Sequence, residues 1–349
     1  MAQAVRFARY GGPEVLELVD IEIPRPGPDE VLVEVVAAGV NPVESAIREG
    51  HHSDHWPVHF PEAQGRDLAG IVRAVGANVH GFKPGDEVMG YVLRGSHATH
   101  VLVPATQLMK KPVNVTWEVA GSLYVAGTTA WTAIRQLNLK PGETVIVTAA
   151  AGGIGALAAQ LAIRAGAKVI GTAHHNRGDY LRQLGVIPVA YEEDLVARAR
   201  ALAPGGVAAI ADFFGSGVSD IARELGVPAS RVVTTLDWDA VDEYGVAKAL
   251  AGDLSILREV TQLIADKQIR LPIADIFAME DIQDAYRKMA KREAPGKIVL
   301  SMQPVLGKAD KWWQPDIRQQ EVTVDVDTTH ERMHVSEGLP YVVASPKRT

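Results

Sequence analysis

The sequence predicts an α/β protein: a doubly wound parallel sheet, covered by helices on both faces, joined to a second, β-rich domain. Three observations favour this fold class. The chain has 349 residues, which is too long for one ordinary compact core, so two domains are expected. Short strands separated by Pro and Gly fill residues 1–120, whereas strands alternate with helices along residues 121–270.

The β-rich region carries β-branched segments that end at Gly or at Asn-Pro. Strands are predicted at 31–40, 69–76 and 100–105. The segments PRPGPDE and FKPGDEV between them predict turns, because Pro fixes φ and Gly tolerates a positive φ. Many short strands with such turns are typical of a barrel-like β domain.

The second region begins with helical spacing of apolar residues over 118–137. The strand TVIVTAA, a helix at 154–165 and the strand KVIGTA follow. The alternation then continues through the helix RGDYLRQLG, PVAY, the helix DLVARARALA, VAAIADFF and RVVTTL. This order predicts a parallel sheet with helices on both of its faces.

From 271 to 302 the chain is expected to return to the first domain. A strand, a helix starting near Met279, a turn at Pro295-Gly296 and the strand KIVLSM are predicted there. The remaining tail, 303–349, is polar apart from Trp312 and Trp313, and its segment EVTVDVD alternates as a half-exposed strand should. The two tryptophans either anchor the tail in a groove or another subunit, or cover its docking site on the same chain.

Composition limits the classes of partner and compartment. The formal charge of −7 disfavours nucleic acid as a partner. With no cysteine, the chain can form neither a disulfide nor a Cys-ligated zinc site. It shows no signal-peptide core and no apolar run near the ~20 residues that span a bilayer. We therefore expect a cytoplasmic protein that does not contact a membrane.

A glycine loop directly follows the strand TVIVT. Ala149, Gly152 and Gly155 form an A-x-x-G-x-x-G pattern that opens a helix. The first small residue permits a tight turn, Gly152 lets a pyrophosphate approach the backbone, and Gly155 lets helix and strand pack closely. The helix N-terminus then presents unpaired N–H groups to the phosphates. The alternative is a glycine turn that only packs helix on strand.

The tip of the next strand decides which dinucleotide is favoured. A carboxylate there would bind the ribose 2′-OH, whereas a 2′-phosphate favours a cation. The sequence has THHNRGD, with Arg177 ahead of the first acid, Asp179. This supports NADPH as the cofactor. The alternative is that Arg177 is an ordinary solvated residue at a helix start.

Five stretches occur in the order AAGVNPVESAIREG (37–50), GRDLAGIVRAVGANVHGFKPGDEVMG (65–90), VAGTTAWTAI (125–134), AAAGGIGALAAQLA (149–162) and GKIVL (296–300). Together they resemble the medium-chain dehydrogenase/reductase superfamily, in its zinc-free quinone oxidoreductase (zeta-crystallin-like) branch. The resemblance implies a GroES-like catalytic domain at 1–120, completed by 271–302, and a Rossmann NADP(H)-binding domain at 121–270. It does not explain the tail.

The resemblance also assigns site residues. It implies that Asn41 lies beside the nicotinamide and the substrate, and that Arg177 and Tyr191 bind the 2′-phosphate. The cofactor-binding residues expected from the loop pattern and the resemblance are Asn41, Thr129, Ala150, Ala151, Gly152, Gly153, Ile154, Thr172, His174, Arg177, Tyr191, Phe213, Phe214 and Leu236. Gly215 of DFFGS is expected beside Phe214 at the nicotinamide ribose.

Departures from the superfamily bear on the chemistry. Its zinc-dependent alcohol dehydrogenases have a ligand Cys near Asn41, a His near Arg66 and a four-Cys lobe, none of which occurs in this chain. An often aromatic position falls on His52, which either faces the substrate as a proton donor or belongs to a solvated loop of histidines. The Asn41 amide is the other candidate donor to the substrate oxygen.

These observations predict a metal-independent enzyme that transfers hydride from NADPH to a quinone or an α,β-unsaturated carbonyl, because such acceptors delocalise the added charge onto oxygen. Two alternatives remain: a reductase of one specialised biosynthetic intermediate, or a nucleotide-binding protein with little turnover. The resemblance further implies a homodimer, formed by pairing edge strands of two cofactor domains.

Overall fold

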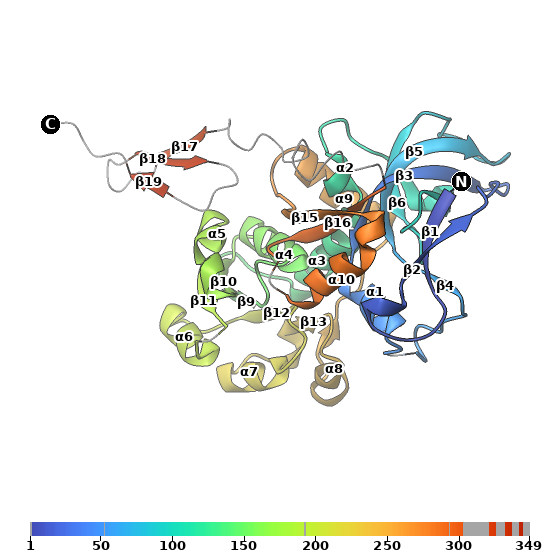
Figure 1. The fold of residues 1–349 in the computed structure, drawn as a ribbon. Coiled ribbons are helices and arrows are strands. Elements are labelled where there is room, and N and C mark those ends of the chain that lie inside the picture. Colours follow the sequence, from blue (N-terminus) through green and yellow to red (C-terminus); the bar gives the residue numbers. More distant parts are fainter. Residues whose placement is uncertain are drawn as a thin grey trace.

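The computed structural model describes residues 2–51, 53–191, 193–292 and 294–302, together with the backbone of three strands nearer the C-terminus. Figure 1 shows two lobes, one around β9–β13 and the other around β1–β6. In the described part of the chain, no helix combines the length and the apolar character needed to cross a bilayer.

One lobe is built on a six-stranded parallel sheet. Its strand order is β11-β10-β9-β12-β13-β14, and every neighbouring pair is parallel. The strands are β9 (Thr144–Val147), β10 (Lys168–Ala173), β11 (Ile187–Ala190), β12 (Ala209–Asp212), β13 (Val232–Thr234) and β14 (Ala247–Lys248). Numbered along the chain, this is the order 3-2-1-4-5-6 of doubly wound folds, so the direction of winding reverses between β9 and β12.

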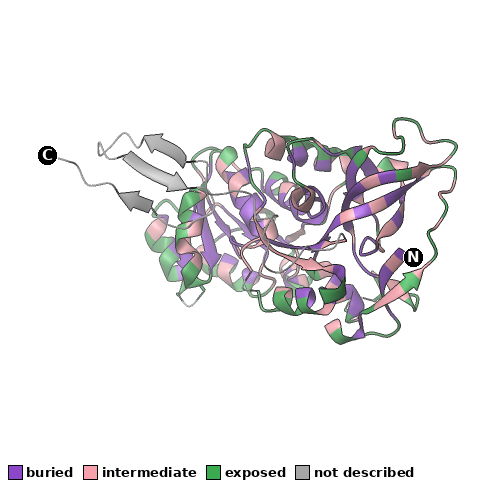
Figure 2. Cartoon of the chain, turned by 45° about the horizontal axis from the view of Figure 1, so that its top comes forward, coloured by how far each residue is buried: buried purple, intermediate pink, exposed green. Residues whose placement is uncertain are grey.

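Helices cover both faces of this sheet, which confirms the predicted fold class. They are α3 (Leu123–Leu137), α4 (Gly153–Arg164), α5 (Gly178–Gln183), α6 (Leu195–Leu202), α7 (Val218–Leu225), α8 (Trp238–Tyr244) and α9 (Leu254–Ala265), with 3-10 turns η3 (His175–Arg177) and η4 (Ala229–Arg231). Successive strand residues alternate between the faces. Val145 and Val147 pack with α3, α4 and α9, whereas Ile146 packs with α6, α7 and α8. Figure 2 shows the strands buried and the exposed residues on the outer helix surfaces.

The other lobe contains a mostly antiparallel seven-stranded sheet and a small three-stranded sheet. The larger has the order β15-β16-β3-β5-β6-β8, with β7 also paired to β3, and the smaller has the order β2-β1-β4. The strands are β1 (Ala2–Phe7), β2 (Glu17–Ile21), β3 (Glu30–Val40), β4 (Glu62–Ala63), β5 (Asp67–Val75), β6 (Glu87–Tyr91), β7 (His100–Pro104), β8 (Leu108–Lys110), β15 (Ile273–Ala278) and β16 (Lys297–Ser301). The helices are α1 (Pro42–Arg48), α2 (Trp117–Ala120) and α10 (Ile282–Ala290), with 3-10 turns η1 (Pro13–Val15), η2 (Ala105–Gln107) and η5 (Met279–Asp281).

Two features of this lobe set up the site. β16 pairs antiparallel with β3, with Ile298 opposite Val40, so the start of β16 lies beside the end of β3. The predicted helical segment 118–137 is broken between α2 and α3. At this break Gly121 approaches β3 so closely that a Cβ would come within 2.4 Å of the Ala37 carbonyl oxygen.

Nearer the C-terminus, β17 (Glu321–Asp325), β18 (Arg332–Ser336) and β19 (Val342–Ala344) form an antiparallel sheet. β17 falls on the segment EVTVDVD, where a strand was predicted. Trp312 and Trp313 lie outside the described residues, so both interpretations of the two side chains stay predictions.

Candidate functional site

The glycine loop joins β9 to α4 and is pinned to β10. The Ala149 and Ala150 amides donate to the side-chain and backbone oxygens of Thr172, at 3.1 and 2.8 Å. Ala149 has a φ of 47°, in the left-handed region, which produces the tight turn expected of the first small residue. Thr172, predicted at the cofactor, is buried and acts here by holding the loop.

The loop leaves open space at the N-terminus of α4 and no space where the helix packs against the loop. A Cβ on Gly155 would come within 2.2 Å of the Ala149 carbonyl oxygen, so this glycine allows the helix to pack against the loop. A Cβ on Gly152 would meet one protein atom, the Ala149 oxygen at 3.3 Å. Gly152 is the N-cap of α4 and no side chain caps the helix. The first-turn N–H groups, at Gly153 and Ile154, are therefore available to an anion such as a pyrophosphate.

The predicted phosphate-binding residues gather at the tip of β10. His174 caps η3 by accepting from the Asn176 amide at 3.5 Å, and half-buried Arg177 ends that turn. Tyr191 follows β11, and its amide donates to the carbonyl oxygen of Ala173 at the end of β10. Its ring lies 5.3 Å from the ring of Phe214. The structure thus brings His174, Arg177, Tyr191 and Phe214 to the same edge of the sheet.

A second cation reaches this edge from the other lobe. Arg292 follows α10 and donates to the Phe214 carbonyl oxygen at 2.9 Å, and its guanidinium lies 5.1 Å from the Phe214 ring. Sequence reasoning missed this residue. Arg292 lies four residues before the quoted GKIVL motif, but nothing in the sequence shows that it crosses to the cofactor lobe.

A buried carboxylate organises the region where the nicotinamide is predicted. Asp212, the last residue of β12, accepts from the hydroxyls of Thr148 and Thr234 at 2.6 and 2.7 Å. It also accepts from the amides of Phe214 and Gly215, at 3.1 and 3.2 Å. Burial raises the pKa of Asp212, and these hydrogen bonds oppose the shift. Asp212 therefore ties together the carboxyl ends of three strands at the point where the winding reverses, a role that the sequence analysis missed.

The other residues predicted at this end surround the same region. Phe213 is buried, Phe214 is half-buried, and Leu236 follows β13. A Cβ on Gly215 would meet the Leu236 Cβ at 2.6 Å, so the loops after β12 and β13 touch here. Thr129 is buried in α3, which packs against β12 and β13, and Ala150 and Ala151 are buried in the loop after β9.

Asn41 lies at the end of β3, where it caps α1. Its side-chain amide donates to Glu44 at 3.0 Å and to Asp67 at 3.1 Å. Its side-chain oxygen accepts from the Lys297 ammonium at 2.5 Å. Asn41 is 1% exposed. Both amide hydrogens are thus donated to carboxylates, and none is left for a substrate oxygen. In this structure Asn41 therefore positions its neighbours, and its role beside the nicotinamide and the substrate stays a prediction.

Lys297 connects this cluster to the glycine loop. The β3–β16 pairing places its ammonium 2.8 Å from the Val40 carbonyl oxygen and 3.7 Å from the Asp67 carboxylate. A Cβ on Gly153 would meet its side chain at 2.8 Å, so the lysine stem lies against the start of α4. The sequence offered one signal for Lys297, its place in GKIVL.

Burial shifts the pKa values of both Lys297 and Asp67. It lowers the pKa of Lys297, which the Asp67 and Glu44 charges oppose. It raises the pKa of Asp67 to about 6, which the Lys297 charge opposes. Behind them, the Tyr286 hydroxyl donates to Glu44 at 2.7 Å and accepts from Gln64 at 2.8 Å. This charged network extends from Tyr286 to the glycine loop.

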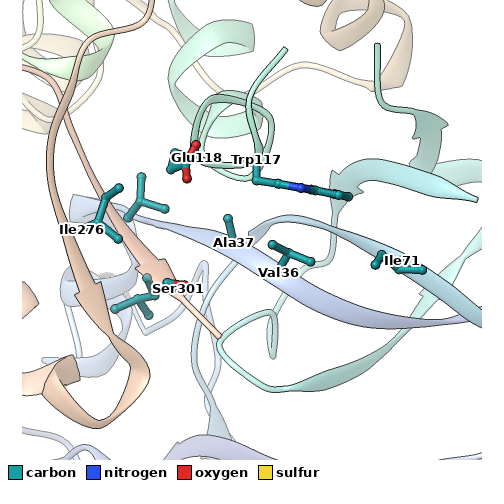
Figure 3. A pocket seen from close by; sticks show the side chains of 9 residues that line it. Val36, Ala37, Ile71, Trp117, Glu118, Ile276 and Ser301 are labelled. Carbon is teal, nitrogen blue, oxygen red and sulfur yellow. The ribbon is translucent and has the colours of Figure 1, made fainter. Parts of the chain in front are cut away.

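His52, the predicted proton donor, lies outside the described residues, so its role stays a prediction. A cavity of about 230 Å³ opens between β3, β16, β15 and α2, and Figure 3 shows Trp117 and Ile276 among its lining residues. None of the predicted site residues lines this cavity.

Comparison with known proteins identifies the family and the fold. Residues 27–113 match the family model of the alcohol dehydrogenase GroES-like domain, and residues 183–300 match that of zinc-binding dehydrogenases. The quinone oxidoreductase of Pseudomonas aeruginosa is 30% identical over 327 residues, which cover 86% of this chain and 99% of that one. The quinone oxidoreductase of Pongo abelii is 39% identical over 181 residues, 51% of this chain; this match spans about half, 54%, of that relative.

A solved structure is similar over the same extent. The quinone oxidoreductase of Escherichia coli, complexed with NADPH, superposes with a TM-score of 0.77 at 26% identity. The match covers 86% of this chain and 99% of the other.

The description of the second family model raises the question of zinc, and the residues here do not fit it. The chain has no cysteine. Among the described residues, no group of three or more His, Asp or Glu side chains is placed to hold a metal ion. At Asn41 and Asp67, where the superfamily's zinc ligands would be sought, the Lys297 ammonium already supplies a positive charge. A divalent cation beside it would be repelled.

Proposed function

This chain belongs to the medium-chain dehydrogenase/reductase superfamily, among the quinone oxidoreductases, and on that premise we propose that it is an NADPH-dependent reductase of quinones or α,β-unsaturated carbonyls. The observation that carries the proposal is the uncapped start of α4 at Gly152, together with Arg177 in the turn after β10 and with Tyr191 and Arg292, which both contact Phe214. A nucleotide diphosphate fits the N–H groups, and an additional phosphate fits the cations.

Bound NADPH would supply a hydride from its nicotinamide ring. A quinone takes up this hydride and one proton to become a hydroquinone. The chain's own contribution is positioning. Ala151, Gly152, Gly153 and Ile154 would hold the pyrophosphate through their backbone. Phe213, Phe214 and Leu236, ordered by Asp212, would form the wall that orients the ring.

The preference for NADPH can be tested with one cation and a matched control. Arg177→Ala removes the proposed partner of the 2′-phosphate. Arg182→Ala removes a neighbouring exposed cation on α5 that is paired with Asp179 at 2.6 Å. We expect Arg177→Ala to weaken NADPH binding by about 1–3 kcal/mol, or roughly 5–150-fold in Kd, with NADH binding unchanged. Arg182→Ala should change neither Kd.

Titration of the intrinsic tryptophan fluorescence measures these constants. Equal affinity of the unmodified protein for NADH and NADPH would contradict the role of Arg177. Consumption of NADPH with a panel of quinones and enones, followed by the absorbance of the reduced nicotinamide, tests the reaction itself. Tight NADPH binding without consumption on any acceptor would favour the nucleotide-binding protein with little turnover.

We further propose a cytoplasmic homodimer. Among the described residues, short β14 is the last strand in the order of the parallel sheet, so it is an edge at which a second copy could add a strand. Sedimentation equilibrium measures the mass directly, and a monomer at all concentrations would contradict the homodimer.

A further inference from the structure

The cavity between α2, β3, β15 and β16 has mostly apolar walls. Val36 and Ala37 line it from β3, Trp117 lines it from α2, and Ile276 lines it from β15. Figure 3 shows Trp117 and the neighbouring Glu118 of α2 above Ala37 and Val36 of β3. Apolar walls that face solvent gain free energy when another apolar group covers them.

The size of the cavity limits what can occupy it. Its volume of about 230 Å³ is below the roughly 300–1,000 Å³ of pockets that bind drug-sized ligands. An apolar cavity of roughly 150 Å³ already binds benzene in another protein. The cavity therefore suits an aromatic group about as large as an indole and is too small for a dinucleotide.

The chain leaves the lobe that contains β3 at this cavity. Ser301, the last residue of β16, lines the cavity, and the Met302 amide donates to the Val36 carbonyl oxygen at 3.0 Å. Trp312 follows Met302 by ten residues in the sequence (312 − 302). Ten residues span at most roughly 33 Å when extended. The two tryptophans of the tail are therefore within reach of the cavity.

Charge favours the same segment of the tail. Within the part of the chain that the structure describes, no cation pairs with the Glu118 carboxylate, because nearby Lys111 pairs with Glu87 at 3.0 Å. The tail carries Lys308 and Lys311 directly before its tryptophans, in GKADKWW. A lysine beside the tryptophans thus matches an acid beside the apolar walls.

We propose that this cavity is the docking site for the tail of the same chain. The indoles of Trp312 and Trp313 cover the apolar walls, and the Lys311 ammonium pairs with the Glu118 carboxylate. This inference goes beyond the proposed function and does not rest on it, so its test needs neither NADPH nor an acceptor.

The absence of cysteine from the sequence permits a clean cross-linking test on the full chain. Glu118→Cys with Lys311→Cys introduces one pair. The control, Glu17→Cys with Lys311→Cys, places the first cysteine at an exposed carboxylate of β2, in the small sheet of the same lobe. Under mild oxidation of dilute protein, the cavity pair should form an intramolecular disulfide at least about tenfold faster than the control, because docking raises the effective concentration. Peptide mass spectrometry identifies the disulfide.

Two further changes test the indoles and the walls. Replacing both tryptophans, by Trp312→Ala with Trp313→Ala, should slow this cross-link to the control rate. In the chain without added cysteines, it should also lower the midpoint of thermal unfolding by about 2–4 °C. Val36→Phe fills the cavity from β3 and should slow the cross-link as well. Val113→Phe adds the same volume at a residue that is 97% exposed, and should leave the rate unchanged. Circular dichroism verifies that each variant is folded.

Each contrary outcome overturns a stated part of the inference. Equal cross-linking rates for the cavity pair and the control would show that the tail does not dock there. Disulfides that join two chains would assign the cavity to the tail of a second copy. An unchanged rate and an unchanged midpoint after removal of both indoles would show that the tryptophans do not occupy the cavity. None of these results bears on NADPH consumption, which tests the proposed function separately.

Discussion

Replacing Lys297 by Met tests whether the buried cation holds the two lobes' site residues together. The methionine stem retains the packing against Gly153, and the substitution removes the charge. It leaves Asp67 and Glu44 buried without their counter-ion, and leaves the Asn41 side-chain oxygen without its 2.5 Å donor. We expect a large loss of stability, because an uncompensated buried charge is costly.

The magnitude follows from the distance. At 3.7 Å between the Lys297 nitrogen and the Asp67 oxygen, the Coulomb attraction is about 4 kcal/mol at an effective dielectric constant of about 20. Removing one partner of such a pair typically destabilises a protein by about 3–5 kcal/mol. Lys297→Met should therefore lower the free energy of unfolding by about 3–5 kcal/mol.

A double-mutant cycle with Asp67→Asn isolates the pair. Urea unfolding is followed by tryptophan fluorescence and circular dichroism, and coincident transitions justify a single free energy. The double variant should be more stable than the sum of the single losses by about 2 kcal/mol, since neither charge is then left unpaired. Additive losses within about 0.5 kcal/mol would show that Lys297 and Asp67 do not stabilise one another, and would refute the reasoning.

Three further outcomes are expected. Gly155→Ala should destabilise the fold by about 2 kcal/mol or more in unfolding curves, because its Cβ would meet the Ala149 oxygen at 2.2 Å. Gly152→Ala should keep the stability of the fold and lose affinity for NADPH in a fluorescence titration. Burial raises the pKa of Asp67 in the folded protein to about 6 from 3.8, so protonated Asp67 contributes fully to the free energy of unfolding below about pH 4, and this contribution is lost as the pH rises through about 6. Relative to Asp67→Asn, the unmodified protein should lose up to about 3 kcal/mol of unfolding free energy between about pH 4 and 7, as measured by denaturation. Asp212→Asn should cost about 1–3 kcal/mol by thermal unfolding, because the position receives hydrogen bonds from four donors and an amide NH₂ adds a fifth; an unchanged midpoint would contradict its organising role.

The sequence was most informative where function depends on local backbone geometry. The glycine loop could be located because its strand, turn and helix are consecutive in the sequence. The steric requirement for each glycine can also be inferred from its spacing in that one stretch. The strands of the parallel sheet were predictable for a similar reason, since buried β-branched runs alternate with helices over residues 121–270.

The charged network was not predictable in this way. Asn41, Asp67 and Lys297 are far apart along the chain and meet because β5 and β16 both pair with β3. Periodicity and motif spacing report on neighbours in sequence, not on such contacts. The sequence does not show that Glu44, Asp67 and Lys297 bond the Asn41 side chain, so it left the Asn41 amide open as one of two candidate donors to the substrate oxygen. Arg292 was missed for the same reason, since it reaches the Phe214 carbonyl oxygen from the other lobe.

The pairing of β3 with β16 also sets an order of events during synthesis. All six strands of the parallel sheet have left the ribosome once residue 248 has emerged, so that sheet can form while translation continues. The lobe that begins the chain must wait for residues 297–301, and until then β3 exposes a hydrogen-bonding edge to solvent and to other nascent chains. The lobe that contains β3 is thus synthesised before the parallel sheet but completes its folding after it. Chains released before residue 297 would carry an aggregation-prone edge.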